Sequence, residues 1–117
     1  MLAGAALAAM PYADVLTNPD AELIRLCEEH VVNINAYNED PSDLDAEDNP
    51  LWHAYERTRD AIGEAKPQTF KGMLAKARAA KAEALNLDGS EKPEHTQAAY
   101  WAWDLVNDLV RLNGGAA

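Results

Sequence analysis

Cysteine and basic residues are scarce in this sequence of 117 residues. The single cysteine, Cys27, cannot form an intramolecular disulfide, so nothing indicates a fold held together by oxidised cysteines. Ten lysines and arginines stand against twenty aspartates and glutamates, which gives a formal net charge of −10. Binding to nucleic acid or to anionic lipid depends on cationic side chains, so we expect neither a nucleic-acid partner nor a membrane partner.

Long apolar runs are missing too. None reaches the roughly 20 residues that cross a bilayer, so stable membrane insertion is not expected. Residues 1–9, Met-Leu-Ala-Gly-Ala-Ala-Leu-Ala-Ala, look like the apolar core of an export leader, but the positive charge that precedes such a core is absent. We expect residues 1–17 to be an apolar tail or the remnant of a leader, disordered or loosely packed outside the core. We expect a cytoplasmic location, with export as the alternative if a longer leader lies upstream.

Helical periodicity is what the sequence does contain, and it predicts an all-α, four-helix bundle-like single domain over residues 18–113. The predicted helices span about 19–38, 50–65, 70–86 and 94–113. Asn18-Pro19 and Asn49-Pro50 each combine a capping side chain with a proline, and Thr69 can cap the third helix.

The fourth predicted helix is the most apolar one. Its apolar side chains cover roughly 200° of the circumference, more than one neighbour covers, so we predict that several helices pack around it. The arc consists of Ala98, Ala99, Trp101, Ala102, Trp103, Leu105, Val106, Leu109, Val110 and Leu112. Leu105 and Leu109 are expected in the core. Trp103 lies about 160° around the helix from Trp101, so we expect Trp103 and Tyr100, or Trp52 on the second helix, to be left outside the core.

The third predicted helix is basic, whereas the loop from Glu39 to Asp48 holds six acids in ten residues. The inner face of this third helix is predicted to comprise Phe70, Met73, Leu74, Ala77, Ala80 and Ala84. Five cations lie between Glu64 and Glu83 with no intervening acid, namely Lys66, Lys71, Lys76, Arg78 and Lys81. No aromatic or glycine-rich loop accompanies them, so we interpret them as charge matching within or between subunits rather than as an anion-binding face.

Catalytic patterns are absent as well. Cys27 and His30 lie three residues apart on one helical face, a spacing that allows a thiolate–imidazolium contact. A cysteine in the apolar stripe of a helix is more typical of a core residue. We therefore predict no catalytic residue, no cofactor-binding residue and no cofactor, and we expect that the protein is not an enzyme.

Two metal-binding motifs are incomplete in this sequence, because residues that the motifs require are replaced by others. Asp43, Asp45 and Glu47 have the spacing of a calcium loop, but Asp48 stands where that loop needs glycine and Ala54 where it needs glutamate. Helical di-metal sites use Glu-x-x-His pairs, and the sequence has only a reversed His-x-x-Glu at positions 53–56. We predict no metal site.

Four stretches together resemble a group of small proteobacterial proteins of unknown function, some of them prophage-associated. They are Asn18-Pro-Asp-Ala-Glu-Leu, Asn49-Pro-Leu-Trp-His-Ala-Tyr-Glu, Thr69-Phe-Lys-Gly-Met-Leu-Ala-Lys-Ala-Arg-Ala and Ala102-Trp-Asp-Leu-Val-Asn-Asp-Leu. The resemblance covers roughly residues 18–112 and implies a helical protein, but no particular activity or functional residues. Members often begin with a twin-arginine-like leader whose tail is similar to residues 2–10, although the arginines are absent here.

We predict a small acidic helical interaction protein that forms a homodimer. The expected interaction surface consists of Trp52, Tyr100, Trp103, Lys71 and Arg78. The alternative is an acidic inhibitor or nucleic-acid mimic that blocks a basic surface on a partner protein. A mimic needs carboxylates fixed on rigid elements, whereas the densest acidic cluster of this sequence lies in a predicted loop.

Overall fold

The computed structural model describes residues 18–114, and over that range the protein is all-α, as the periodicity predicted. Its helices are α3 (Ala21–Asn38), α4 (Pro50–Glu64), α5 (Phe70–Ala84) and α6 (Gln97–Leu109). A 3-10 turn, η1 (Ala46–Asp48), precedes α4, and a π-helical turn, η2 (Val110–Gly114), follows α6. The predicted tail or leader remnant, residues 1–17, lies outside the described residues.

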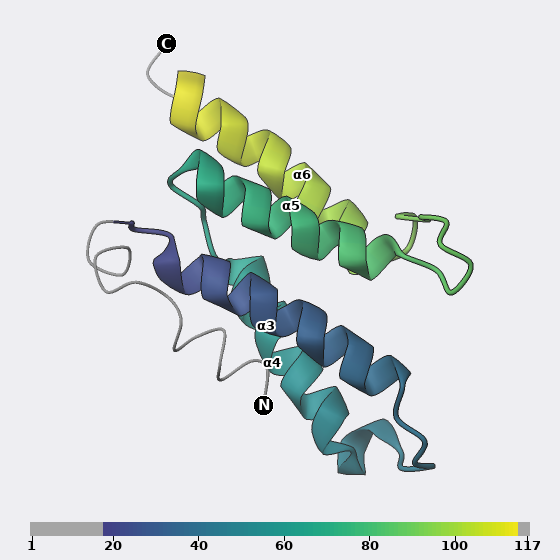
Figure 1. The fold of residues 1–117 in the computed structure, drawn as a ribbon. Coiled ribbons are helices and arrows are strands. Elements are labelled where there is room, and N and C mark those ends of the chain that lie inside the picture. Colours follow the sequence, from purple (N-terminus) through teal and green to yellow (C-terminus); the bar gives the residue numbers. More distant parts are fainter. Residues whose placement is uncertain (1–17, 115–117) are drawn as a thin grey trace.

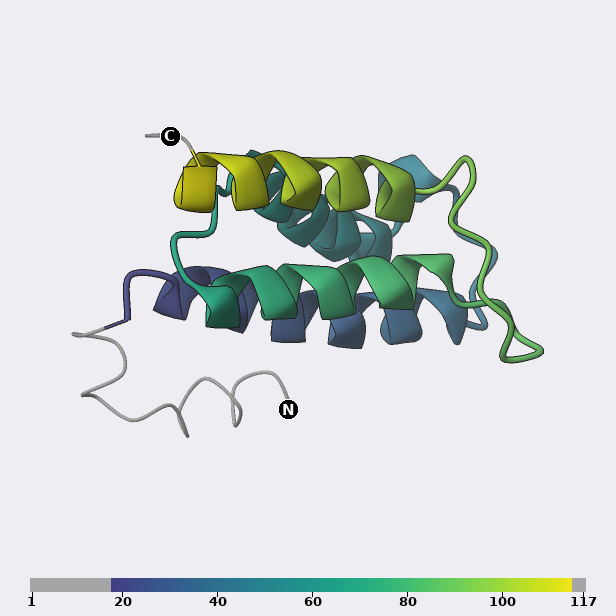
Figure 2. The ribbon, with the colours of Figure 1, turned by 90° about the horizontal axis from the view of Figure 1, so that it is seen from above.

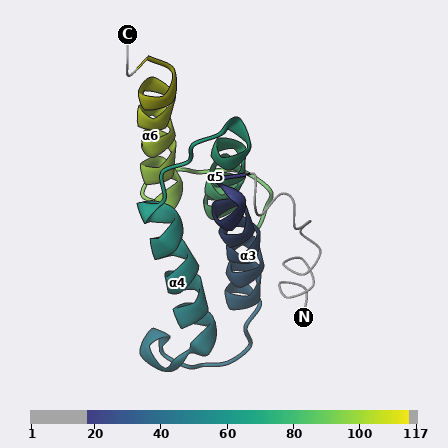
Figure 3. The ribbon, with the colours of Figure 1, turned by 90° about the vertical axis from the view of Figure 1, so that its left-hand side faces the viewer.

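The four helices form two layers of two (Figures 2 and 3). One layer holds α3 and α5, which run side by side in the same direction (Figure 1). The other holds α4, which packs on α3, and α6, which packs on α5 in the opposite direction. The end of α4 meets α6 at Trp101, whose Nε1 atom is 3.7 Å from the Cβ position of Gly63. The result is a bundle-like but open arrangement, because α4 and α6 do not pack along one another.

Side-chain caps fix the starts of three helices. The side-chain oxygens of Asn49, Thr69 and Thr96 accept hydrogen bonds from the backbone N–H groups of residues 51, 72 and 98, respectively. Thr96 is the cap of α6, so this helix begins three residues later than the predicted position 94. Helix α3 begins at Ala21 rather than at residue 19, because a turn precedes it in which the Asn18 side chain accepts from Asp20 N–H.

Asp20 joins the starts of α3 and α5. Its buried carboxylate accepts hydrogen bonds from Gln68 N–H, from Thr69 N–H at 2.7 Å and from the Thr69 hydroxyl at 2.6 Å. Gly72 makes room for this contact, since a Cβ atom there would lie 2.1 Å from an Asp20 carboxylate oxygen. The cluster Asp20–Gln68–Thr69–Gly72, called here the Asp20 clasp, therefore sets the parallel register of α3 and α5.

The core lies between the two layers. Its buried members are Leu23, Cys27, Ile62, Ala79, Ala80, Ala84, Ala98 and Trp101. Trp101 is fully buried, and its ring makes an edge contact with His30 of α3 at 5.3 Å between centroids. Small alanines on α5 and α6 let these helices approach closely while the Trp101 indole fills the space between the layers.

The predicted inner face of α5 is partly wrong. Met73, Ala80 and Ala84 are buried, but Phe70 is 75% exposed and Leu74 is also exposed. The face is instead rotated towards Lys76, one of the five predicted cations, which is only 1% exposed. Lys76 can be buried because its aliphatic stem packs in the core while its Nζ donates to the Ala65 carbonyl and to Asp104, both at 3.3 Å.

The predicted central position of α6 is also wrong. Only Ala98, Trp101 and Asp108 of α6 are buried, Leu105 is half-buried, and Leu109 is 55% exposed. The physical reason is the open arrangement, in which α6 has one long neighbour, α5, and reaches α3 and the end of α4 through Trp101. Most of the wide apolar arc of this helix therefore faces outwards.

Candidate interaction surfaces

Cys27 and His30 are both buried on α3, but they do not form a catalytic pair. The two ring nitrogens of His30 lie 2.7 Å from the Thr58 hydroxyl and 2.7 Å from a carboxylate oxygen of Glu83. Burial raises the pKa of the Cys27 thiol to about 12, so this residue is a protonated core thiol at neutral pH.

His30 is the centre of a polar network that connects α3, α4 and α5. The Tyr55 hydroxyl donates to the second carboxylate oxygen of Glu83 at 3.0 Å, and the Tyr55 ring stacks on His30 at 5.1 Å. Burial, followed by the negative charge of Glu83, raises the pKa of Tyr55 above its ordinary value. Every polar group of this network is used in packing the three helices together, which leaves a structural role rather than a reactive one.

Metal-ligating side chains do not converge in the part of the chain that the structure describes. Within residues 18–114, no group of three or more His, Cys, Asp or Glu side chains is placed to hold a metal ion. In the acidic loop, the Asp40 carboxylate instead accepts hydrogen bonds from the backbone and side chain of Ser42 and from the Asn49 amide. These hydrogen bonds lower the pKa of Asp40.

The outer side of α6 exposes several large apolar side chains. This α6 face consists of Ala99, Tyr100, Ala102, Trp103, Val106, Leu109 and Val110, all of them exposed. Tyr100 is 69% exposed and Trp103 is 64% exposed. On a helical projection the face spans roughly 180° and includes one polar residue, Asn107, but no charged residue, because Asp104, Asp108 and Arg111 lie outside this arc.

Trp52 is not part of that surface. Its ring packs against Tyr37 at 5.2 Å and against Tyr55 at 5.1 Å, and the residue is half-buried. Trp52 therefore covers the end of the α3–α4 pair, and its role as an interaction residue stays a prediction.

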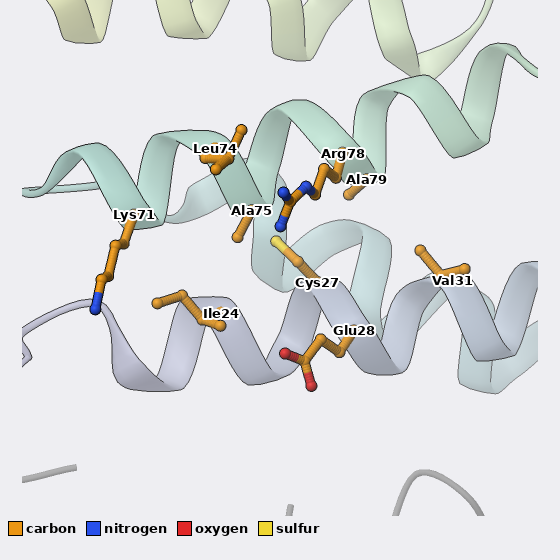
Figure 4. Close-up of a pocket in the computed structure, with 9 residues that line it drawn as sticks. All are labelled: Ile24, Cys27, Glu28, Val31, Lys71, Leu74, Ala75, Arg78 and Ala79. Carbon is orange, nitrogen blue, oxygen red and sulfur yellow. The ribbon is translucent and has the colours of Figure 1, made fainter. Parts of the chain in front are cut away.

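A groove between α3 and α5 forms a second candidate surface (Figure 4). This α3–α5 groove has a volume of about 590 Å³. It is lined by Ile24, Cys27, Glu28 and Val31 of α3 and by Lys71, Leu74, Ala75, Arg78 and Ala79 of α5. Six of these side chains are apolar or a thiol, and three, Glu28, Lys71 and Arg78, are charged. Lys71 and Arg78, two of the predicted interaction residues, are thus brought together here, whereas Tyr100 and Trp103 lie on the α6 face.

A third concavity lies between the end of α4 and the inner side of α6, and it is polar. Its volume is about 380 Å³, and its lining includes Lys76, Asp104, Asp108 and Arg111. These charges are already paired, since Lys76 donates to Asp104 and Arg111 donates to Asp108 at 3.0 Å. Arg111 also donates to the Pro67 carbonyl at 2.8 Å, so this cluster attaches α6 to the α4–α5 connection.

Comparisons of the chain with protein-family models, with curated proteins and with solved structures found no match. Among residues 18–114, no helix combines the length and the apolar character needed to cross a membrane. Function is therefore inferred from the surfaces alone.

Proposed function

We propose that this protein is a small acidic helical interaction protein that forms a homodimer through its α6 face. The observation that carries the proposal is the uncharged apolar arc on α6 with two exposed aromatic residues, Tyr100 and Trp103. Interface centres are depleted in charge and enriched in aromatic residues, which matches the composition of this face.

The area of the α6 face suits a dimer. Aromatic side chains bury about 150–250 Å² each when they are fully covered, and Tyr100 and Trp103 are 69% and 64% exposed. The two therefore offer roughly 250 Å² between them, and Val106, Leu109 and Val110 add a similar amount. Two such faces together would bury about 1,000 Å², which is where specific interfaces begin. A twofold axis would place the same face on both sides, so one apolar arc is sufficient for a closed dimer.

Trp103→Glu tests this proposal. Placing a carboxylate near the middle of the α6 face should raise the dimer dissociation constant at least about 30-fold, because a central tryptophan is a typical interface hot spot. Sedimentation velocity across a range of protein concentrations would measure the constant. Leu87→Glu is the matched control, since it adds the same charge at a fully exposed leucine in the α5–α6 loop.

Two results would contradict the proposal. One is a monomeric wild-type protein at about 100 µM, a concentration at which even a weak specific interface is populated. The other is a dimer that Trp103→Glu leaves unchanged while the variant keeps its helical circular dichroism spectrum.

A further inference from the structure

The α3–α5 groove is an apolar concavity that no described helix covers, and we propose that it holds residues 2–16 of the same chain. Apolar concavities of this size are typical of binding sites, because leaving them in water is unfavourable. None of the residues that line the groove belongs to α4 or α6, so it is distinct from the α6 face, although Cys27 and Ala79 of the core lie in its wall. The sequence of residues 1–17, which precede the described part of the chain, supplies the chemistry of the occupant.

Composition is the first reason for this occupant. Residues 2–16 include Leu2, Leu7, Met10, Val15 and Leu16, and they carry a single charged side chain, Asp14. An almost uncharged apolar segment suits the apolar lining residues Ile24, Val31, Leu74 and Ala75.

Charge complementarity is the second reason. Lys71 lies at the same end of the groove as Ile24, near the start of α3 (Figure 4). Asp14 is separated from Asn18 by only three residues, so its carboxylate would enter the groove at the end where Lys71 is found. Lys71 has no ion pair with any residue in the range 18–114.

Reach is the third reason. The turn at residues 18–21, in which Ala21 N–H donates to the Asn18 carbonyl, bends the chain away from the axis of α3 directly before that helix begins. The α3 side of the groove extends from Ile24 to Val31, about 10 Å at the helical rise per residue. Fifteen residues cover about 20 Å even as a helix, so residues 2–16 are long enough. Covalent attachment also gives the segment an effective concentration near the millimolar range, an advantage over any separate partner.

A spin label in the segment tests the proposal on the full chain. Cys27→Ala removes the only cysteine, and Leu7→Cys then carries a nitroxide. We expect the amide NMR signals of Ile24, Val31 and Leu74 to lose most of their intensity, while that of Trp103 keeps its intensity. Leu74→Glu, at an exposed position of the groove, should restore the lost signals, and Leu87→Glu, outside the groove, should not.

A charge exchange gives an independent test. Lys71→Glu should weaken the broadening of the groove signals, and Lys71→Glu combined with Asp14→Lys should recover it. Unbroadened groove signals in the spin-labelled chain would overturn the proposal. So would broadening that appears only when spin-labelled protein is mixed with unlabelled ¹⁵N protein, since the occupant would then be a second copy. Broadening that neither Leu74→Glu nor Lys71→Glu changes would also overturn the proposal, because the segment would then lie outside the groove.

Discussion

Asp20→Ala should destabilise the protein by about 2–4 kcal/mol, although Asp20 precedes the first residue of α3. Asp20 is 3% exposed, and its carboxylate accepts hydrogen bonds from two backbone N–H groups and one hydroxyl. A hydrogen bond to a charged group contributes about 1.5–3 kcal/mol, and the sum is reduced here because Gln68 and Thr69 lie near the surface and can bind water once the carboxylate is gone. Asp20→Asn should cost about half as much, since it keeps an acceptor oxygen but loses the charge.

Urea unfolding followed by tryptophan fluorescence at one fixed protein concentration measures these differences. Asp60→Ala is the control, because Asp60 is an exposed carboxylate paired with Arg59 and should contribute less than about 1 kcal/mol. Gly72→Ala adds a second test, since its Cβ would collide with the Asp20 carboxylate. The cost of Gly72→Ala should be smaller in the Asp20→Ala background than alone. An Asp20→Ala loss no larger than that of Asp60→Ala, or full additivity with Gly72→Ala, would refute the role of the Asp20 clasp.

Two further predictions concern the core and its thiol. Leu105→Ala should lower the free energy of unfolding more than Leu109→Ala does, because Leu105 is half-buried and Leu109 is exposed. At concentrations where the protein is monomeric, Leu109→Ala should cost less than about 0.5 kcal/mol, and equal losses for the two variants in urea unfolding would contradict this. The Cys27 pKa is raised in the folded state from 9.0 to about 12, so its contribution to stability is complete below pH 9 and is lost as the pH rises from 9 towards 12. Cys27→Ala should therefore flatten the decline of stability between pH 9 and pH 12. The wild-type thiol should react with a disulfide reagent at pH 8 only as fast as the protein opens, and a rapid reaction in the folded state would contradict the burial of Cys27.

Local signals in the sequence were sufficient to predict the helical class. Helix α4 shows why, because Asn49 caps it, Pro50 begins it, and its buried residues Thr58 and Ile62 follow helical spacing. These signals act within one turn or a few turns of one helix, and so they survive whatever tertiary arrangement the helices adopt.

Errors arose where a tertiary partner decides which side of a helix is buried. On α5, Lys76 lies inside because a carbonyl at the end of α4 and Asp104 of α6 receive its ammonium group, and neither partner is visible in the α5 sequence. On α6, the apolar arc was read as a central helix, although an arc of that width is equally compatible with a surface left for a partner. Helical periodicity shows which side chains share a face, but it does not show how many neighbouring helices pack against that helix.

The polar contacts that position the helices could not be predicted either. Asp20 and Thr69 are 49 positions apart, and His30 and Glu83 are 53 positions apart. A sequence motif records short spacings, so neither the Asp20 clasp nor the His30 network leaves a recognisable local pattern. The wide separation of Tyr100 and Trp103 from Trp101 around α6 was the one signal that pointed to a candidate surface, and the structure places Trp101 inside and the other two outside.

The attachment of α6 to the rest of the protein has a consequence for local unfolding. Helix α6 is held by α5 along its length, by Trp101 at one end and by Arg111 at the other, whereas α3 and α5 each have two helical neighbours and share the Asp20 clasp. In an isolated protomer, the amide hydrogens of α6 should therefore exchange with solvent at a lower opening free energy than those of α3 and α5. A second copy on the α6 face would raise that opening free energy in proportion to the logarithm of protein concentration, so a helix at the edge of the monomer would become a central helix only in the assembled state.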